Sequence, residues 1–263
     1  MKTCPREFVD LGLRLADASG AIIRRYFRTA VAVDDKPDHS PVTIADREAE
    51  AAMRAIIRDV FPDHGVIGED YGPTNPDAEF VWVLYPIDGT KSFITGRPLF
   101  GTLIGLVRLG SPIFGIIDHP ALLERWVGAL GSPALFNNQP AKVRPCPRLS
   151  DAALYATSPH MFVGVDFVAF ERLRRAVKFP LYGADCYAYG LLASGFADLV
   201  VEASMSVHDF IALAAVVTGA GGIISDWQGQ PLTLHSDGRI AAAGDIGTHR
   251  AALDLLAGDD RRG

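Results

Sequence analysis

Acidic residues stand at the ends of the predicted elements of this chain. Asp88 lies in the turn that follows an apolar run at Phe80–Leu84, and Glu69 follows another short apolar run. Asp209 begins an apolar helical run, and Asp46 lies at the start of a second predicted helix. Oxygen ligands of this kind suit hard cations such as Mg²⁺. Two such ions can clamp a phosphate, activate a water and stabilise a leaving alkoxide.

Each acidic residue also has a purely structural interpretation. The segment from Thr43 to Asp46 fits a helix capping box, and Asp209 would favour a helix N-terminus electrostatically. Glu69 could end a strand in solvent, and Asp88 with the glycine after it forms a common turn dipeptide. For each residue taken alone, both interpretations stay open.

The composition is that of an ordinary globular protein. The chain has 263 residues, 49% hydrophobic and 21% charged, which suffices for one large domain or two tightly packed halves. Its net charge of −6 argues against a nonspecific nucleic-acid binder. No apolar run approaches the ~20 residues of a membrane span, and no signal-peptide core follows the N-terminus. We therefore expect a cytoplasmic protein with no membrane association.

Hydrophobic periodicity divides the N-terminal half into two helices and a sheet. Helical spacing predicts helices over 7–28 and about Ile44–Val60, separated by a polar turn-rich loop at 34–41. Asn137 and Asn138 predict a hairpin turn. Short apolar runs punctuated by Gly and Pro predict strands at Gly65–Gly68, Phe80–Leu84, Gly101–Val107, Ile113–Ile117 and Arg125–Ala129.

The pattern changes after roughly residue 147, where helices and strands begin to alternate. We therefore expect an N-terminal α+β half at 1–147 and a C-terminal α/β half at 148–263, joined as one compact unit. The expected elements are strands at Ala153–Thr157, Ala197–Glu202, Gly222–Ser225 and Ile240–Ala243, and helices near 164–178, 185–194 and 208–220 and at the C-terminus.

One further segment links the acidic residues to the motifs of a single family. Residues 82–93 read Trp-Val-Leu-Tyr-Pro-Ile-Asp-Gly-Thr-Lys-Ser-Phe, and their turn can aim a carboxylate, a hydroxyl and a free carbonyl at one point. Together with 40–46, Gly68-Glu69-Asp70, and Asp209 with Gly219-Ala220-Gly221-Gly222, this segment resembles the successive motifs of the inositol monophosphatase family. The resemblance covers nearly the whole chain. Segments 90–98 and 185–189 resemble its histidinol-phosphatase-like branch.

The resemblance implies a fold and a reaction. The fold is a layered αβαβα sandwich, and the reaction is Mg²⁺-dependent hydrolysis of a small phosphate monoester by metal-bound water, without a protein nucleophile. Histidinol phosphate is the favoured substrate and inositol phosphate the next. The family resemblance also implies a homodimer.

The resemblance also assigns metal-binding and catalytic roles by position. Glu69 would bind a metal and orient the water, with Thr90 beside it. The Ile87 carbonyl would bind the first metal, while Asp88 and Asp209 would bind the second. On the loop side, the catalytic set would include Thr43 and Asp46, near a weaker metal region.

Other positions would contact the substrate. Gly89 and Thr90 would offer backbone N–H groups to the phosphate, favoured by a helix that starts there. Lys36 and Arg97 could steer the phosphate, or could simply be solvated loop residues. Asp185 and Glu202 would face hydroxyls or an amine of the substrate. A carboxylate at 185 suits a cationic substrate, and the alternative is that it caps the helix after Gly183.

One position departs from the family pattern. Tyr85 stands where the family has an Asp that bridges two metal ions. A phenol, with a reference pKa near ~10, cannot replace a bridging carboxylate at neutral pH, and its ring would crowd the metal site. The sequence therefore predicts a phosphatase whose activity is impaired by Tyr85. The alternative is a non-catalytic relative or an inactive mutant that binds a ligand or partner without turnover.

Overall fold

The computed structural model describes residues 1–35 and 41–258. Lys36, Ser40 and most of the loop predicted at 34–41 lie outside the described residues. The loop prediction is wrong at its two ends, because strand β1 (Val33–Asp35) pairs antiparallel with strand β2 (Pro41–Thr43). This pairing satisfies backbone groups that a free loop would leave to water.

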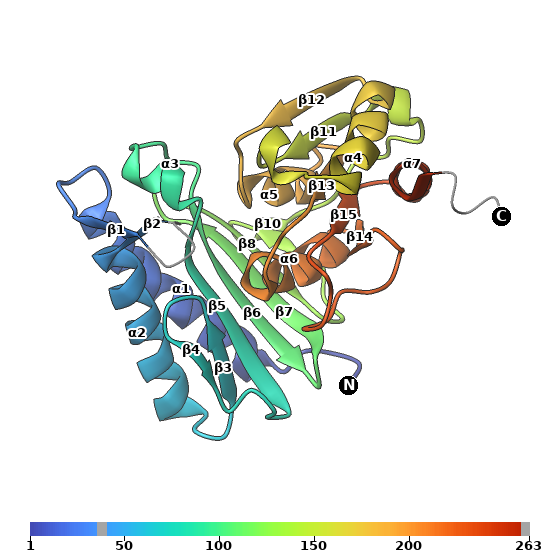
Figure 1. Cartoon of the computed structure of the whole chain (residues 1–263). Coiled ribbons are helices and arrows are strands. Elements are labelled where there is room, and N and C mark those ends of the chain that lie inside the picture. The colour runs from blue at the N-terminus through green and yellow to red at the C-terminus, as the bar shows by residue number, and fades with distance from the viewer. Residues whose placement is uncertain (36–40, 259–263) are drawn as a thin grey trace.

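Two N-terminal helices cover one face of a large sheet. Helix α1 spans Arg6–Tyr26 and helix α2 spans Ile44–Val60, so both predicted helices are confirmed. They pack against each other and bury their apolar stripes, which include Leu15 and Met53, against strands of the sheet. Figure 1 shows both helices, in blue, on the same side of the green strands.

The large sheet has eight strands in the order β10-β9-β8-β7-β6-β5-β3-β4. All neighbouring pairs are antiparallel except β3 with β5. The five predicted strands are confirmed, and the short β4, β9 and β10 were missed because two or three residues give no periodicity. Asn137 and Asn138 form the predicted hairpin turn, both with positive φ. The strand bounds are β3 Gly65–Gly68, β4 Gly72–Thr74, β5 Phe80–Asp88, β6 Gly101–Arg108, β7 Ser111–His119, β8 Glu124–Ala129, β9 Leu135–Phe136 and β10 Gln139–Pro140.

The C-terminal half forms a five-stranded mixed sheet in the order β12-β11-β13-β15-β14. The predicted alternation of helix and strand is confirmed, except that the edge strand β12 was not predicted. The bounds are α4 Val165–Ala176, α5 Tyr187–Ala193, α6 Val207–Gly219, α7 Ile246–Ala257, β11 Ala153–Ala156, β12 Phe179–Tyr182, β13 Leu199–Glu202, β14 Ile223–Asp226 and β15 Ile240–Ala243.

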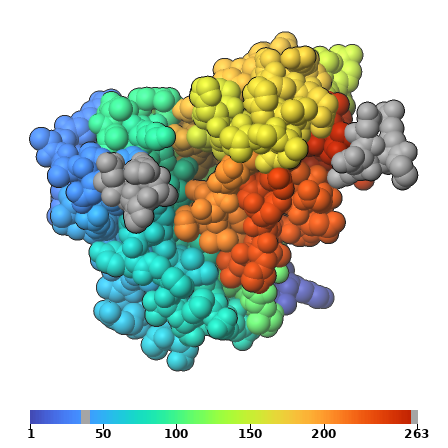
Figure 2. All heavy atoms as spheres, viewed as in Figure 1, coloured from blue at the N-terminus to red at the C-terminus, as the bar shows by residue number. Residues whose placement is uncertain are grey.

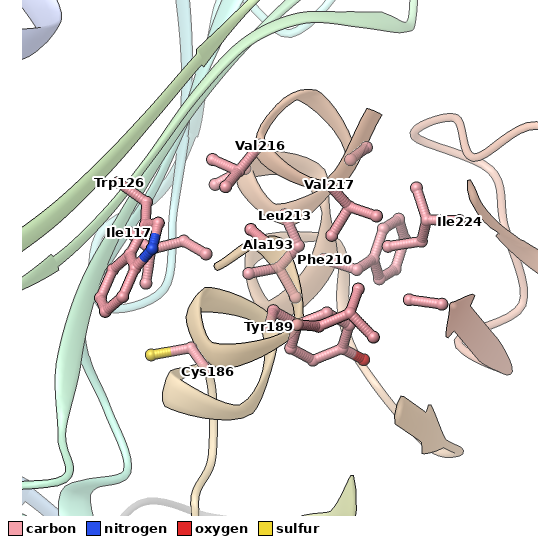
Figure 3. Packing of buried hydrophobic residues seen from close by; sticks show 14 of the residues in the cluster. Ile117, Trp126, Cys186, Tyr189, Ala193, Phe210, Leu213, Val216, Val217 and Ile224 are labelled. Atoms are coloured by element: carbon pink, nitrogen blue, oxygen red, sulfur yellow. The ribbon is translucent and has the colours of Figure 1, made fainter. Parts of the chain in front are cut away.

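Helices α5 and α6 form the middle layer between the two sheets. Figure 3 shows Ile117 and Trp126 of the large sheet on one side, and Tyr189, Leu213 and Val217 of these helices beside them. Helices α4 and α7 cover the outer face of the small sheet. The expected αβαβα layering is therefore confirmed, with helix α6 of the C-terminal half seated on the N-terminal sheet.

The space-filling view shows that the N-terminal and C-terminal halves of the chain lie against each other. In Figure 2, the yellow to red segments of the C-terminal half lie directly on the green and teal segments of the N-terminal half. Within residues 1–35 and 41–258, no helix is long and apolar enough to cross a membrane. The boundary at 147 and the treatment of the halves as one unit stay predictions.

Candidate active site

Strand β5 ends in a bulge that leads into the turn at Gly89. The strand continues four residues beyond the predicted Leu84, as far as Asp88. Its register against β6 shifts between Tyr85 and Asp88, so one extra residue bulges from the ladder. Pro86 has no N–H for the ladder, and its carbonyl accepts a hydrogen bond from Thr102 Oγ1 at 2.7 Å. The bulge re-aims the side chains at the end of the strand.

A short helix follows the bulge at once. Helix α3 spans Thr90–Ile94, so a helix does begin at the position where one was expected. Its N-cap Gly89 has φ 82°, and a Cβ there would lie 2.8 Å from Asp185 Oδ2. Only glycine satisfies both constraints. Thr90 Oγ1 donates to the Ile87 carbonyl at 3.1 Å, which ties the predicted carbonyl ligand to the turn.

Glu50 fixes the loop that carries Glu69. The Glu50 side chain is fully buried on α2, and its oxygens accept hydrogen bonds from the backbone N–H groups of Asp70 (2.8 Å) and Tyr71 (3.2 Å). Arg54 Nε donates to the same carboxylate at 2.7 Å. Sequence reasoning missed Glu50, because a Glu inside a helix gives no sign that it reaches a distant loop.

Glu50→Ala is expected to lower the free energy of unfolding by roughly 3 kcal/mol. The change breaks a buried ion pair and leaves loop N–H groups unsatisfied. Glu48→Ala on the same helix is the matched control, because Glu48 pairs with Arg25 in solvent and should change stability by less than ~1 kcal/mol. Urea unfolding measures both. Equal losses in the two variants would show that Glu50 does not anchor the loop.

The structural interpretations of Asp46 and Asp209 are confirmed. Thr43 and Asp46 form a capping box on α2, with the Thr43 N–H and Oγ1 both donating to Asp46 Oδ2. Asp209 closes the equivalent box on α6 by accepting from the Ser206 N–H at 2.6 Å. The cap does not remove Asp209 from the site, because one of its oxygens holds the cap while the side chain lines a pocket. Asp46 is not among the residues that line this pocket.

The pocket brings together four of the predicted site residues. It has a volume of about 120 Å³ and includes Asp88, Asp185, Glu202 and Asp209 in its lining. Burial first, then the charges of Asp185 and Asp209, raise the pKa of Asp88 well above its usual range. Burial raises the pKa of Asp209 to about 6. Carboxylates crowded in this way favour a cationic partner.

The loop before α5 positions Asp88 and Asp185. The Cys186 N–H donates to Asp88 Oδ2 at 2.7 Å, so the two halves of the chain meet at this carboxylate. Asp185 has φ 48° and accepts a hydrogen bond from Ser92 Oγ at 3.3 Å. The alternative in which Asp185 caps α5 is wrong, because the N-cap is Cys186 and no side chain caps that helix. The backbone turn points the Asp185 side chain to α3 instead.

Glu202 lies at the end of β13 in a closed hydrogen-bond network. It accepts from the Thr157 N–H at 2.9 Å, from Thr157 Oγ1, and from the Tyr189 hydroxyl at 2.9 Å. Burial raises the pKa of Glu202 to about 7. Sequence reasoning missed Thr157 as a pocket residue. The only signal was that Thr157 ends a predicted strand; the parallel pairing of β11 with β13, whose carboxyl ends are where ligands bind, appears only in the structure.

Arg97 does not point freely into the pocket. Its Nη2 donates to the Gly183 carbonyl at 2.7 Å, which ties the segment after α3 to the loop before α5. Arg97 therefore lies near Asp185 and has a structural contact of its own. The predicted role in steering phosphate stays a prediction.

Tyr85 lies among the acidic residues. Its ring packs edge-on against the ring of His208, with centroids 5.6 Å apart. Burial and the negative charges of Asp88, Asp209, Glu69 and Asp46 raise the pKa of Tyr85 well above its usual range. The phenol is therefore neutral at physiological pH and adds no negative charge to the site.

The residues present do not fit a two-ion centre. Their donor chemistry suits a hard cation, since the predicted set consists of carboxylates and one carbonyl. Within the described part of the chain, however, no group of three or more His, Cys, Asp and Glu side chains is placed to hold one ion. The position where the resemblance expects a shared carboxylate carries the Tyr85 ring.

Comparison with known proteins decides the family. The sequence profile described as the inositol monophosphatase family matches residues 5–260. The chain belongs to this family. A solved inositol monophosphatase from Zymomonas mobilis is 47% identical, with a TM-score of 0.89 over 96% of this chain and 98% of that one. The arrangement of sheets and helices is therefore the family fold.

Two relatives within the family indicate the kind of reaction. The chain is 50% identical to the chloroplastic bifunctional phosphatase IMPL2 of Arabidopsis thaliana, over 95% of this chain and 75% of that protein. It is 33% identical to a histidinol-phosphatase of Chlorobaculum parvum, over 93% of this chain and 95% of that protein. The family and these relatives point to a phosphatase that acts on a small phosphorylated compound.

Proposed function

We propose that this chain has the site of a Mg²⁺-dependent histidinol-phosphate phosphatase and that Tyr85 impairs its catalytic activity. Inositol monophosphate is the second substrate candidate. The observation that carries the proposal is the acidic pocket beside Asp88, whose lining among the described residues has four carboxylates and no basic side chain, with Arg97 and Lys91 near Asp185 outside it. The name of the Chlorobaculum parvum relative supports the same substrate. We further propose a cytoplasmic homodimer.

The charge of the pocket supports histidinol phosphate over inositol phosphate as the substrate. Histidinol phosphate carries an amine that is cationic at neutral pH, whereas the ring of inositol phosphate carries only hydroxyl groups. A buried carboxylate binds a cation through charge-assisted hydrogen bonds, which are about twice as strong as neutral ones. Asp185 is suited to this contact, because one strained turn holds its side chain at the pocket and Ser92 fixes an oxygen.

Other residues around the pocket would bind the phosphate and the polar end of the substrate. The turn at Gly89 and the start of α3 would hold the phosphate by backbone N–H groups, as helix starts commonly do. Glu202, fixed by Thr157 and Tyr189, would accept a hydrogen bond from the polar end of the substrate. Positioning is most of what a protein supplies to phosphoryl transfer, and this arrangement supplies it.

Asp185→Asn is expected to weaken binding of histidinol phosphate by about 10-fold or more and to change binding of inositol phosphate much less. The loss of a charge-assisted hydrogen bond costs on the order of 1.5–3 kcal/mol. The measurement is calorimetric binding of each compound. Asp254→Asn, an exposed carboxylate on α7, is the control. Equal losses for both compounds would reduce Asp185 to a structural residue.

A second function follows from Tyr85 itself. A chain without a two-ion centre could bind the phosphate ester, or a partner, without hydrolysing it. This proposal predicts that histidinol phosphate binds to the chain as written and is recovered intact after long incubation with Mg²⁺. Release of inorganic phosphate at an ordinary enzymatic rate would refute it.

A further inference from the structure

A second charged cavity lies on the opposite face of the large sheet, under helix α1. Its volume is about 280 Å³, and its walls come from α1, from the β7–β8 connection and from the β9–β10 turn. Asp118 and His119 are consecutive on β7, so their side chains point to opposite faces. His119 contacts Cys186 on the side of the acidic pocket, while Asp118 lines the second cavity.

The cavity is lined by two acids and two bases, and three of these form ion pairs with one another among the described residues. Arg125 donates from Nε to Asp118 Oδ1 at 2.7 Å and from Nη1 to Asp17 Oδ1 at 2.8 Å. In the part of the chain that the structure describes, Arg24 forms no ion pair. The lining therefore has balanced charge overall, and among the described residues the Arg24 guanidinium has no ion-pair contact, although its charge acts on Asp118.

An acceptor without a partner lies next to this guanidinium. Asp118 is only 4% exposed, and its Oδ2 has no hydrogen-bond partner among the described residues. Leaving a buried acceptor unsatisfied costs about 1–3 kcal/mol. Gly20 keeps this corner open, because a Cβ there would lie 3.3 Å from Asp118 Oδ2 and 3.2 Å from Arg24 Nη1.

We propose that this cavity binds a small zwitterion of the α-amino acid class. Its carboxylate would pair with Arg24, and its ammonium group would donate to Asp118 Oδ2. A simple anion would leave the Asp118 oxygen unsatisfied, and a simple cation would leave Arg24 without an ion-pair contact. A molecule that carries both charges a few ångströms apart satisfies both groups, and the cavity is large enough to hold it.

Calorimetric titration of the full chain with each of the twenty amino acids tests this proposal, with acetate and ethylamine as single-charge probes. At least one amino acid should bind more tightly than either probe. Arg24→Ala and Asp118→Asn should each raise its Kd by about tenfold or more, which corresponds to the loss of one charge-assisted hydrogen bond. Arg14→Ala, an exposed arginine of the same helix outside the cavity, should leave the Kd unchanged.

Three results would overturn the proposal. The first is that no amino acid binds. The second is that acetate or ethylamine binds as tightly as the best amino acid. The third is that the Kd of that amino acid is unchanged in both Arg24→Ala and Asp118→Asn. Because Arg24 is exposed on a helix surface, its substitution should not prevent folding even if Asp118→Asn does. The readout is binding alone, so the outcome does not depend on whether the acidic pocket hydrolyses a phosphate.

Discussion

Tyr85→Asp is expected to raise Mg²⁺-dependent hydrolysis of a phosphate monoester by at least ~100-fold, the scale on which catalytic electrostatic contacts act. Phosphoryl transfer depends mainly on positioned charge. The partly buried phenol adds no negative charge among Asp88, Asp209 and Glu69, and its ring occupies space that a carboxylate would leave open. Release of inorganic phosphate from histidinol phosphate and inositol phosphate measures the effect.

Two further variants separate charge from size. Tyr85→Asn relieves the bulk of the ring without adding a charge, and Tyr85→Phe keeps the ring and removes the hydroxyl. If the missing carboxylate is the cause, only Tyr85→Asp gains activity. A comparable gain in Tyr85→Asn would assign the defect to steric crowding. High activity of the chain as written, with no gain in Tyr85→Asp, would show that residue 85 is not at the metal position.

Metal binding should change just as strongly. We expect the chain as written to bind at most one Mg²⁺ or Mn²⁺ ion, weakly, and Tyr85→Asp to bind two. A ligand that binds only the folded protein stabilises it by about 2.7 kcal/mol at a concentration of 100 Kd. Millimolar Mg²⁺ should therefore raise the melting temperature of Tyr85→Asp much more than that of the parent chain. Isothermal titration calorimetry gives the number of ions.

The metal-free form of the same variant supplies an internal check. Without Mg²⁺, a new carboxylate would stand beside Asp88 and Asp209, whose pKa values burial already raises. Like charges in a buried site disfavour ionisation, so Tyr85→Asp in a chelator should melt below the parent chain. Tight binding of two ions by the parent chain would contradict the prediction. A melting temperature of Tyr85→Asp that does not change when Mg²⁺ is added would also contradict it.

Much of this protein could be predicted from its residues alone, because local patterns report local structure. Helix α2 begins and ends at the predicted residues, since Thr43 and Asp46 cap its start and Pro62 follows its end. The turn predicted at 86–90 is in the structure the bulged end of β5 followed directly by the start of α3. The motifs spaced along the chain predicted the family, and the family profile confirms it.

The tertiary structure alone decided which of these residues meet. The Cys186 N–H reaches Asp88 from 98 residues away in the chain, and Glu50 holds a loop 20 residues from its own helix position. The backbone at Asp185 turns its side chain away from the helix that it would cap in the alternative interpretation. Such contacts depend on how the sheets and helices stack, and hydrophobic periodicity says which face is buried but not what lies opposite. The sequence by itself determined most of the elements and the family, and it predicted the departure at Tyr85, whereas packing decided the acidic pocket and the second cavity.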